Sequence, residues 1–376
     1  MTEYVPGLAG VPAARSSISF IDGEQGILEY RGIRIETLAQ HSTFEETAYL
    51  LLHGKLPGRD ALRRFSETLG EARRLPPALE GLIRSFPKGA RPMEVLQACA
   101  AALGTFLPEA DYGRADAREW AAVEIIAKIP SIAAAFERYR RGEDAIEPDP
   151  GLGHAVDFVR MITGSEPDGQ RARVMDVALI LHADHTMNAS TFAARVTAST
   201  NGSPFAVVSS AIGCLAGSLH GGANERVLIQ LREIGAVDRV EEAVRSMVLK
   251  REKIMGLGHR VYKTKDPRAI ILQGLATELF ETTGKSDVYD LAVALENVAG
   301  ELLGHKGIYP NVDFYSGIVY DKLGVPRDLF TPVFAVSRAA GWMAHWLEQM
   351  RDNRLFRPRQ IYEGSRDVTY VPLAER

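Results

Sequence analysis

The stretch from Phe205 to Leu219, FAVVSSAIGCLAGSL, has a small or apolar side chain at nearly every position. A helix at a protein surface carries charged residues along one face, and this stretch has none, so it predicts a helix inside a large bundle. It is shorter than the roughly 20 residues that a membrane span needs, and Ser209, Ser210, Gly213 and Gly217 interrupt it. Segments 174–183 and 191–198 are similar in character and predict two more interior helices.

Helical patterns continue through most of the remaining chain. A proline inside such a pattern usually ends or kinks the helix, so the segment 120–139 is predicted to break at Pro130. Four further segments show apolar residues at helical spacing on one face and polar residues on the other, which predicts amphipathic helices. They are 240–250, 269–280, 288–303 and 334–350.

Only residues 17–33 favour β structure. Short apolar runs there are separated by Asp22-Gly23 and Arg31-Gly32, and such dipeptides indicate small hairpins. The chain shows no strand–helix–strand alternation and no repeat of fixed period. The predicted fold class is therefore mainly α, with a minor β hairpin near the N-terminus, and 376 residues suggest two or three domains.

The composition narrows the choice of partners and compartment. A net charge of −4 gives no reason to expect a nucleic acid or a membrane surface as a partner. The cysteines Cys99 and Cys214 lie in apolar runs, which favours buried thiols in a reducing compartment. The N-terminus lacks the basic and apolar regions of a secretory signal, so we expect a cytoplasmic protein.

Two histidines stand in unusual surroundings. His220 ends the long apolar stretch and precedes Gly221-Gly222, whose bare backbone would let a substrate approach closely. An alternative is that His220 caps the C-terminus of that helix. His259 follows Gly256-Leu257-Gly258, a loop whose N–H groups could face an anion, although an ordinary glycine turn with a surface histidine is equally compatible.

Asp313 lies between the apolar residues Val312 and Phe314. Burial would raise the pKa of its carboxyl group and strengthen it as a base. The alternative, that Asp313 caps the following helix, is about as well supported by the local sequence.

His182, Asp184 and His185 follow an apolar segment, and they could form a polar cluster at a helix end, contact a polar ligand or bind a metal. Arg268, Arg338 and Arg357 are candidates to bind a carboxylate, because the guanidinium group matches it in geometry. Arg338 lies in a helical segment next to small residues, and a buried arginine needs a partner.

These segments, taken in order, resemble the citrate synthase family from about residue 7 to about residue 365. We found no departure from the family pattern at a catalytic position. The segments that carry the resemblance are His182-Ala183-Asp184-His185 with Asn188-Ala189-Ser190, 219–224, 256–262 with Asp266-Pro267-Arg268, 310–317, and Arg357-Pro358-Arg359-Gln360.

The resemblance implies a helical subunit of two domains. Residues 1–221 and 325–376 would form a large, dimer-forming domain. Residues 222–324 would form a smaller domain that binds coenzyme A and closes over the site. The resemblance also implies a homodimer with shared active sites, in which the partner subunit contributes Arg357.

Roles for single residues follow from the same resemblance. Its catalytic residues would be His220, His259 and Asp313. Its oxaloacetate ligands would be His185, Arg268, Arg338 and Arg357. Its coenzyme A contacts would be Lys253, Ile254, Met255, Gly256, Leu257 and Lys306.

The reaction implied is condensation of acetyl-CoA with oxaloacetate and water to give citrate and CoA, the first step of the tricarboxylic acid cycle. Acetyl-CoA is then a substrate, and neither a cofactor nor a metal is expected. The closest alternative is a 2-methylcitrate synthase that uses propionyl-CoA, or a bifunctional enzyme, since one methylene is worth only about 1–3 kcal/mol. Alternatives from other classes are a metal-dependent hydrolase using His182, Asp184 and His185, and a non-catalytic helical scaffold.

Overall fold

The computed structural model describes residues 4–284 and 286–376 of the chain. Helices make up most of these residues, as the sequence predicts, and short 3-10 turns join several of them. The 3-10 helices are η1 (Pro6–Leu8), η2 (Val237–Arg239), η3 (Gly304–Lys306), η4 (Arg327–Leu329) and η5 (Leu373–Glu375). The α-helices are α1 (Ile35–His41), α2 (Phe44–His53), α3 (Arg59–Ala72), α4 (Pro77–Ser85), α5 (Pro92–Phe106), α6 (Ala115–Arg140), α7 (His154–Thr163), α8 (Gly169–His182), α9 (Ala189–Ser199), α10 (Pro204–Leu215), α11 (Ala223–Ile234), α12 (Val240–Lys250), α13 (Pro267–Thr283), α14 (Asp287–Leu303), α15 (Val312–Lys322) and α16 (Phe330–Gln349).

The predicted β region near the N-terminus is confirmed as a small antiparallel sheet of strand order β1-β2-β3. Its strands are β1 (Ser19–Asp22), β2 (Ile27–Tyr30) and β3 (Ile33–Arg34). Asp22 stabilises the turn after β1, because its Oδ1 atom accepts hydrogen bonds from the backbone N–H groups of Glu24 and Gln25.

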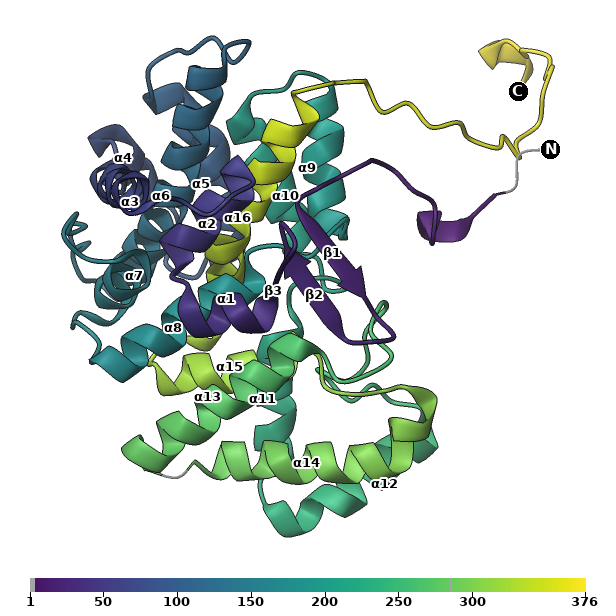
Figure 1. The fold of residues 1–376 in the computed structure, drawn as a ribbon. Helices are drawn as coiled ribbons and strands as arrows, with labels where there is room; N and C mark the ends of the chain where they lie inside the picture. Colours follow the sequence, from purple (N-terminus) through teal and green to yellow (C-terminus); the bar gives the residue numbers. More distant parts are fainter. Residues whose placement is uncertain (1–3, 285) are drawn as a thin grey trace.

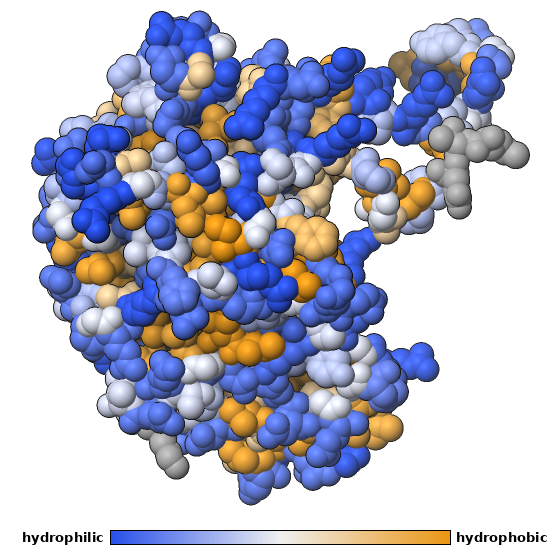
Figure 2. All heavy atoms as spheres, in the orientation of Figure 1, coloured by the Kyte–Doolittle hydropathy of each residue, from blue (hydrophilic) through white to orange (hydrophobic). Residues whose placement is uncertain are grey.

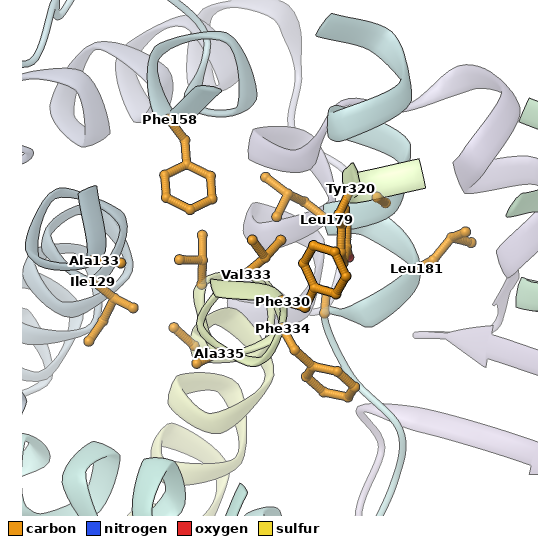
Figure 3. Close-up of a cluster of buried hydrophobic side chains, with 14 of the residues drawn as sticks. Ile129, Ala133, Phe158, Leu179, Leu181, Tyr320, Phe330, Val333, Phe334 and Ala335 are labelled. Atoms are coloured by element: carbon orange, nitrogen blue, oxygen red, sulfur yellow. The ribbon is translucent and has the colours of Figure 1, made fainter. Parts of the chain in front are cut away.

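Helix α16 lies at the centre of the large helical bundle. It packs against α2, α6, α8, α9 and α10. Figure 3 shows Val333 and Ala335 of α16 with Ile129 and Ala133 on one side and Leu179 and Tyr320 on the other.

The prediction that residues 334–350 form an amphipathic helix is wrong, because α16 is buried on nearly all sides. Its polar residues suggested a solvent-facing side, but they bond inside the protein. Ser337 Oγ donates to the carbonyl of Leu179, and Arg338 Nε donates to the carbonyl of His182 over 2.6 Å.

The predicted break at Pro130 is also wrong, since α6 runs without interruption from Ala115 to Arg140. Proline removes one backbone donor. The whole stretch from Ala121 to Glu137 is, however, almost completely buried. Packing of this stretch against α3, α5, α7 and α16 therefore outweighs the local cost of the proline.

Helices α11 to α15 lie together at the bottom of Figure 1, below the central bundle, which they contact where α13 and α15 meet α8. They pack in pairs, α13 and α11 against α15 and α12 against α14. This group begins at Ala223 and ends at Lys322, close to the expected limits of the smaller domain, 222–324. The division into two domains remains a prediction.

The two ends of the described chain extend from the body at the right of Figure 1. Residues 357–376 are exposed at every position. Figure 2 shows hydrophilic residues over most of the visible face, with apolar residues in smaller patches. Within residues 4–284 and 286–376, no helix combines the length and apolar character needed to cross a membrane.

Candidate active site

A cavity of about 1530 Å³ brings together side chains from distant parts of the sequence. Its wall includes residues 7–14, residues that follow α8, the loop before α11, the segment from 251 to 261 and the start of α15. Of the predicted site residues, only Arg357 does not line it. Those that do are His185, His220, Lys253, Ile254, Met255, Gly256, Leu257, His259, Arg268, Lys306, Asp313 and Arg338.

His220 is held by the first turn of α9. The backbone N–H of Ser190 points at His220 Nε2 over 3.3 Å, and Ser190 Oγ lies 2.8 Å from the same nitrogen. Because Nε2 accepts the backbone N–H of Ser190, the neutral ring carries its proton on Nδ1. Burial and the nearby Arg338 lower the pKa of His220 to about 4, so the ring is an uncharged donor at neutral pH.

The alternative that His220 caps a helix is wrong. Helix α10 ends at Leu215, and its C-cap is Ala216. The chain then turns twice, because the N–H of His220 donates to the carbonyl of Gly217 and the N–H of Gly221 to that of Leu215. This turn, and not a helix end, directs His220 toward the cavity.

His259 is oriented by the backbone that follows it. Its Nδ1 atom accepts hydrogen bonds from the N–H groups of Val261 at 3.0 Å and Tyr262 at 3.2 Å. The proton of the neutral ring is therefore on Nε2. Burial, followed by the positive charge of Arg268, lowers the pKa of His259 to about 4. His259 is thus a second neutral donor in the same cavity, not a surface histidine.

Asp313 is the second residue of α15, and Asn311 is the residue that caps this helix. The side chain of Asn311 accepts the N–H of Asp313 over 3.0 Å, so the alternative of Asp313 as a cap is wrong. Its Oδ1 atom is buried with no hydrogen-bond partner among the described residues. Burial raises the pKa of Asp313 to about 7, a value suited to a general base near neutral pH.

His185 lies beside His259, with ring centroids 5.2 Å apart. Its Nε2 atom shares a 3.3 Å hydrogen bond with the hydroxyl of Tyr262. Burial and the nearby Arg268 hold the pKa of His185 well below its usual range. Tyr262 thus contacts both histidines, a role the sequence did not reveal because an aromatic residue after His259 reads as ordinary core.

The two buried arginines of the cavity differ in their partners. Asp266 binds Arg268 through two hydrogen bonds, to Nε at 3.0 Å and to Nη2 at 2.7 Å. Arg338 has no carboxylate within salt-bridge distance in the part of the chain that the structure describes. Burial lowers its pKa to about 10, which leaves it charged. An unpaired buried guanidinium group is a binding site for an anion.

Cationic side chains outnumber acidic ones in the cavity wall. This balance suits a large anionic ligand, such as one with phosphates or several carboxylates. The acidic residues are Glu252 and Asp313, and the cationic residues are Arg226, Arg251, Lys253, Arg260, Arg268, Lys306 and Arg338. The sequence did not identify Arg226, Arg251 or Arg260, because each reads as a solvated surface charge.

The three residues that could form a metal site, His182, Asp184 and His185, each contact a different partner. His182 Nδ1 donates to the carbonyl of Ala178 over 2.8 Å, Asp184 lies 3.3 Å from His345, and His185 contacts Tyr262. The described part of the chain contains no group of three or more histidine, cysteine or acidic residues suited to a metal. The metal-dependent hydrolase therefore receives no support from the geometry.

Arg357 lies outside the cavity, on the exposed C-terminal segment. Its guanidinium group donates to the carbonyl of the neighbouring Pro358. It does not line the cavity of its own chain, and the family resemblance assigns it to the cavity of a partner subunit.

Comparison with known proteins gives consistent matches over the whole chain. The sequence model of the family described as citrate synthase, C-terminal domain, matches residues 7–359. The chain is 54% identical over 378 residues to a citrate synthase of Synechocystis sp., covering 99% of this chain and 94% of that protein.

Solved structures agree with the sequence matches. A citrate synthase of Pyrobaculum aerophilum has a TM-score of 0.93 and 41% identity, covering 99% of this chain and 95% of that one. A ternary complex of carboxymethyl coenzyme A and oxaloacetate with the citrate synthase of Thermoplasma acidophilum has a TM-score of 0.94 and 35% identity, and the match covers 100% of both chains.

Proposed function

The chain belongs to the citrate synthase family, and from that premise we propose that it condenses acetyl-CoA with oxaloacetate and water to give citrate and CoA. The observation that carries the proposal is the combination in one cavity of a carboxyl group with a raised pKa and two neutral histidine donors. This step would open the tricarboxylic acid cycle.

Asp313 would remove a proton from the methyl group of acetyl-CoA. A thioester methyl is a very weak acid, so the developing enolate needs stabilisation as the proton leaves. His220 would supply it by donating the hydrogen bond of Nδ1–H to the thioester oxygen. A neutral donor suits this task, because a protonated histidine would raise the charge near Asp313 and lower its basicity.

His259 would act on the second substrate. Its Nε2–H would donate to the ketone oxygen of oxaloacetate while the methyl carbon attacks the ketone carbon, so that negative charge on this oxygen is neutralised as it forms. Arg268, Arg338 and His185 would bind the two carboxylates. Water would then cleave the citryl thioester and release CoA.

The cationic side chains of the cavity wall support a phosphorylated substrate. Lys253, Lys306 and the main chain of 254–257 would contact coenzyme A, and closure of residues 222–324 would exclude water until the carbon–carbon bond exists. The residues 254–257 pack directly on the segment that carries Asp313, since the N–H of Asn311 donates to the carbonyl of Gly256 over 2.9 Å. Binding of CoA at these residues would therefore act on the placement of the base through the backbone.

Release of free thiol from acetyl-CoA, measured with and without oxaloacetate, tests the proposal. We expect release only with oxaloacetate, full activity after exhaustive chelation of metals, and near-complete loss in Asp313→Ala with folding retained. Faster turnover with propionyl-CoA than with acetyl-CoA would favour the 2-methylcitrate alternative. Loss of activity on chelation would favour a metal-dependent enzyme, and an Asp313→Ala variant with parental activity would exclude the assigned base.

We also propose that the chain acts as a homodimer in which Arg357 enters the cavity of the partner subunit. The exposed C-terminal segment supports this, because its apolar side chains have no cover within one chain. Examples are Leu355 (62% exposed), Ile361 (62%) and Tyr370 (78%). Such a segment is suited to burial against a second copy.

Mixed dimers test this arrangement directly. Arg357→Ala and Asp313→Asn are each expected to give little activity at low oxaloacetate. When both chains are co-expressed, a mixed dimer would contain one cavity with Asp313 of one chain and Arg357 of the other, so activity should return. If Arg357 served its own chain, both cavities of the mixed dimer would be defective and no activity would return.

A cytoplasmic location is proposed on narrower grounds. Cys99 is a buried free thiol and Cys214 a half-buried one, and unpaired cysteines are typical of reducing compartments. Cell fractionation with an antibody to the native protein would test the location, and recovery in a membrane or secreted fraction would contradict it.

A further inference from the structure

Asn311 joins the two chain segments that carry His259 and Asp313. Its backbone N–H donates to the carbonyl of Gly256 over 2.9 Å. Its side-chain Nδ2 donates to the carbonyl of Gly258, also over 2.9 Å. Its Oδ1 accepts the N–H of Asp313 over 3.0 Å. One residue thus contacts the carbonyl immediately before His259 and the first turn that presents Asp313.

The segment from Gly256 to Gly258, which accepts these hydrogen bonds, has a backbone conformation that lets it lie close to Asn311. Gly256 and Gly258 adopt positive φ angles of 73° and 82°, a conformation that favours glycine. A Cβ atom at Gly256 would lie 2.9 Å from the Cα atom of Phe314. The N–H of Gly258 also donates to the carbonyl of Tyr309 over 2.8 Å. The two segments therefore have little freedom to move apart without losing hydrogen bonds.

Both ends of the Asn311 amide are used, which explains the residue type. Serine and aspartate cap helices as well as asparagine does, but neither can accept the N–H of Asp313 with one atom and donate to the carbonyl of Gly258 with another. Aspartate would place a carboxylate against that carbonyl, and serine is too short to reach it. The cap alone does not require asparagine, whereas the bond to Gly258 does.

We propose that Asn311 is a positioning residue that sets the placement of His259 relative to Asp313. The proposal rests on the proposed function, in which Asp313 forms the enolate of the acyl group and His259 activates the ketone that the enolate attacks. Asn311 lines the cavity, but its role here is exerted through His259 and Asp313, because its Nδ2 and Oδ1 atoms each bond to the main chain beside one of them.

This role predicts a specific defect. In Asn311→Ser the helix cap is kept, so Asp313 and His220 should still form the enolate. His259 is no longer held at its distance from Asp313, so the enolate should attack the ketone less often. Asp313 should more often exchange the abstracted proton with solvent and then reprotonate the enolate. Misplacement by about 1 Å lowers rates by roughly 10²-fold. Citrate formation should fall by about that factor, with the KM for each substrate changed less than about threefold.

The test uses acetyl-CoA deuterated in the methyl group, in ordinary water with oxaloacetate. Citrate formation and loss of deuterium from unreacted acetyl-CoA are measured together. In Asn311→Ser the number of deuterium atoms lost per citrate formed should rise at least about tenfold over the parent enzyme. The matched control is Asp168→Ser, which alters the exposed cap of α8, where Asp168 accepts the N–H of Arg171, and it should behave like the parent.

Several outcomes would overturn the assignment. Equal losses of citrate formation and deuterium exchange would mean that Asn311 only supports folding. Citrate formation within about twofold of the parent would mean that the bond to Gly258 is not needed. If Asn311→Ser does not fold, Asn311→Asp, which retains the cap, is measured in the same way, and the same ratio decides. A parent enzyme that forms no citrate would instead refute the proposed function, and this assignment with it.

Discussion

Replacing Asp313 with asparagine should abolish condensation and also stabilise the fold above neutral pH. The carboxyl group is placed where charge is unfavourable, since Oδ1 is buried without a hydrogen-bond partner among the described residues. Asparagine has nearly the same shape and no charge. Removal of a positioned general base typically lowers the rate by about 10²- to 10⁴-fold, so citrate formation should fall at least that far.

The size of the stabilisation follows from the raised pKa. Burial moves the pKa of Asp313 from 3.8 to about 7. Below pH 3.8 the carboxyl group is protonated in both the folded and the unfolded chain, so its pKa shift costs no stability. As the pH rises toward 7, the unfolded chain releases the proton while the folded chain retains it. The folded state then loses about 1.4 kcal/mol per pH unit, up to roughly 4 kcal/mol above pH 7.

Chemical unfolding of Asp313→Asn and of the parent, at one protein concentration and at several pH values from 5 to 8.5, measures this effect. The difference in the free energy of unfolding should widen in favour of the variant up to about pH 7 and then stay constant. Asp60→Asn, at a solvent-exposed carboxylate, is the control and should show little such trend. A difference for Asp313→Asn that does not change with pH would refute the claim that burial of Asp313 disfavours its charge.

Three further perturbations test other parts of the site. Because Asp313 must be deprotonated to act and has a pKa of about 7, kcat/KM should fall about tenfold per unit below pH 7; a profile flat down to pH 5 would contradict this. In Gly23→Ala the new Cβ would lie 2.2 Å from the carbonyl oxygen of Val261, so the His259 loop must shift and kcat should fall by roughly 10²-fold. Gly89→Ala, where no atom lies within 4 Å, should match the parent. Arg338→Gln should raise the KM for oxaloacetate at least about tenfold, as an unpaired buried donor for a carboxylate is lost; a change confined to the KM for acetyl-CoA would contradict this.

The sequence predicted which residues line the cavity better than it predicted the local role of each of them. The order of the motifs around His185, His220, His259 and Asp313 was sufficient to group them. Local sequence supported Asp313 as a helix cap about as well as a base, and it did not point to Asn311, although asparagine also caps helices well. The deciding fact is that the chain is still extended at Asn311, and this depends on the hydrogen bonds from Asn311 to Gly256 and Gly258.

Other features depend on tertiary structure and leave no local pattern. The polar residues of α16 suggested an exposed face, but their partners come from α8 and α9, more than 100 residues away in sequence. Arg195, for example, donates to His345 Nδ1 over 3.0 Å. In the same way, Arg226 and Arg251 become part of the cavity only because α11 and α12 lie beside it. Periodicity reports which residues share a face, and it cannot report what covers that face.

The electrostatics of the cavity account for the choice of these residue types. Burial and the charge of Arg338 lower the pKa of His220 to about 4, and burial and the charge of Arg268 do the same for His259. Burial has the opposite effect on a carboxyl group and raises the pKa of Asp313 to about 7. Above pH 7 the histidines are therefore uncharged donors while the carboxylate is ionised, which is the combination that proton abstraction next to a carbonyl requires. Between pH 4 and 7 the histidines keep that state, and only the base is lost. The loss of activity on acidification should thus follow the titration of one group, Asp313, until the pH approaches 4.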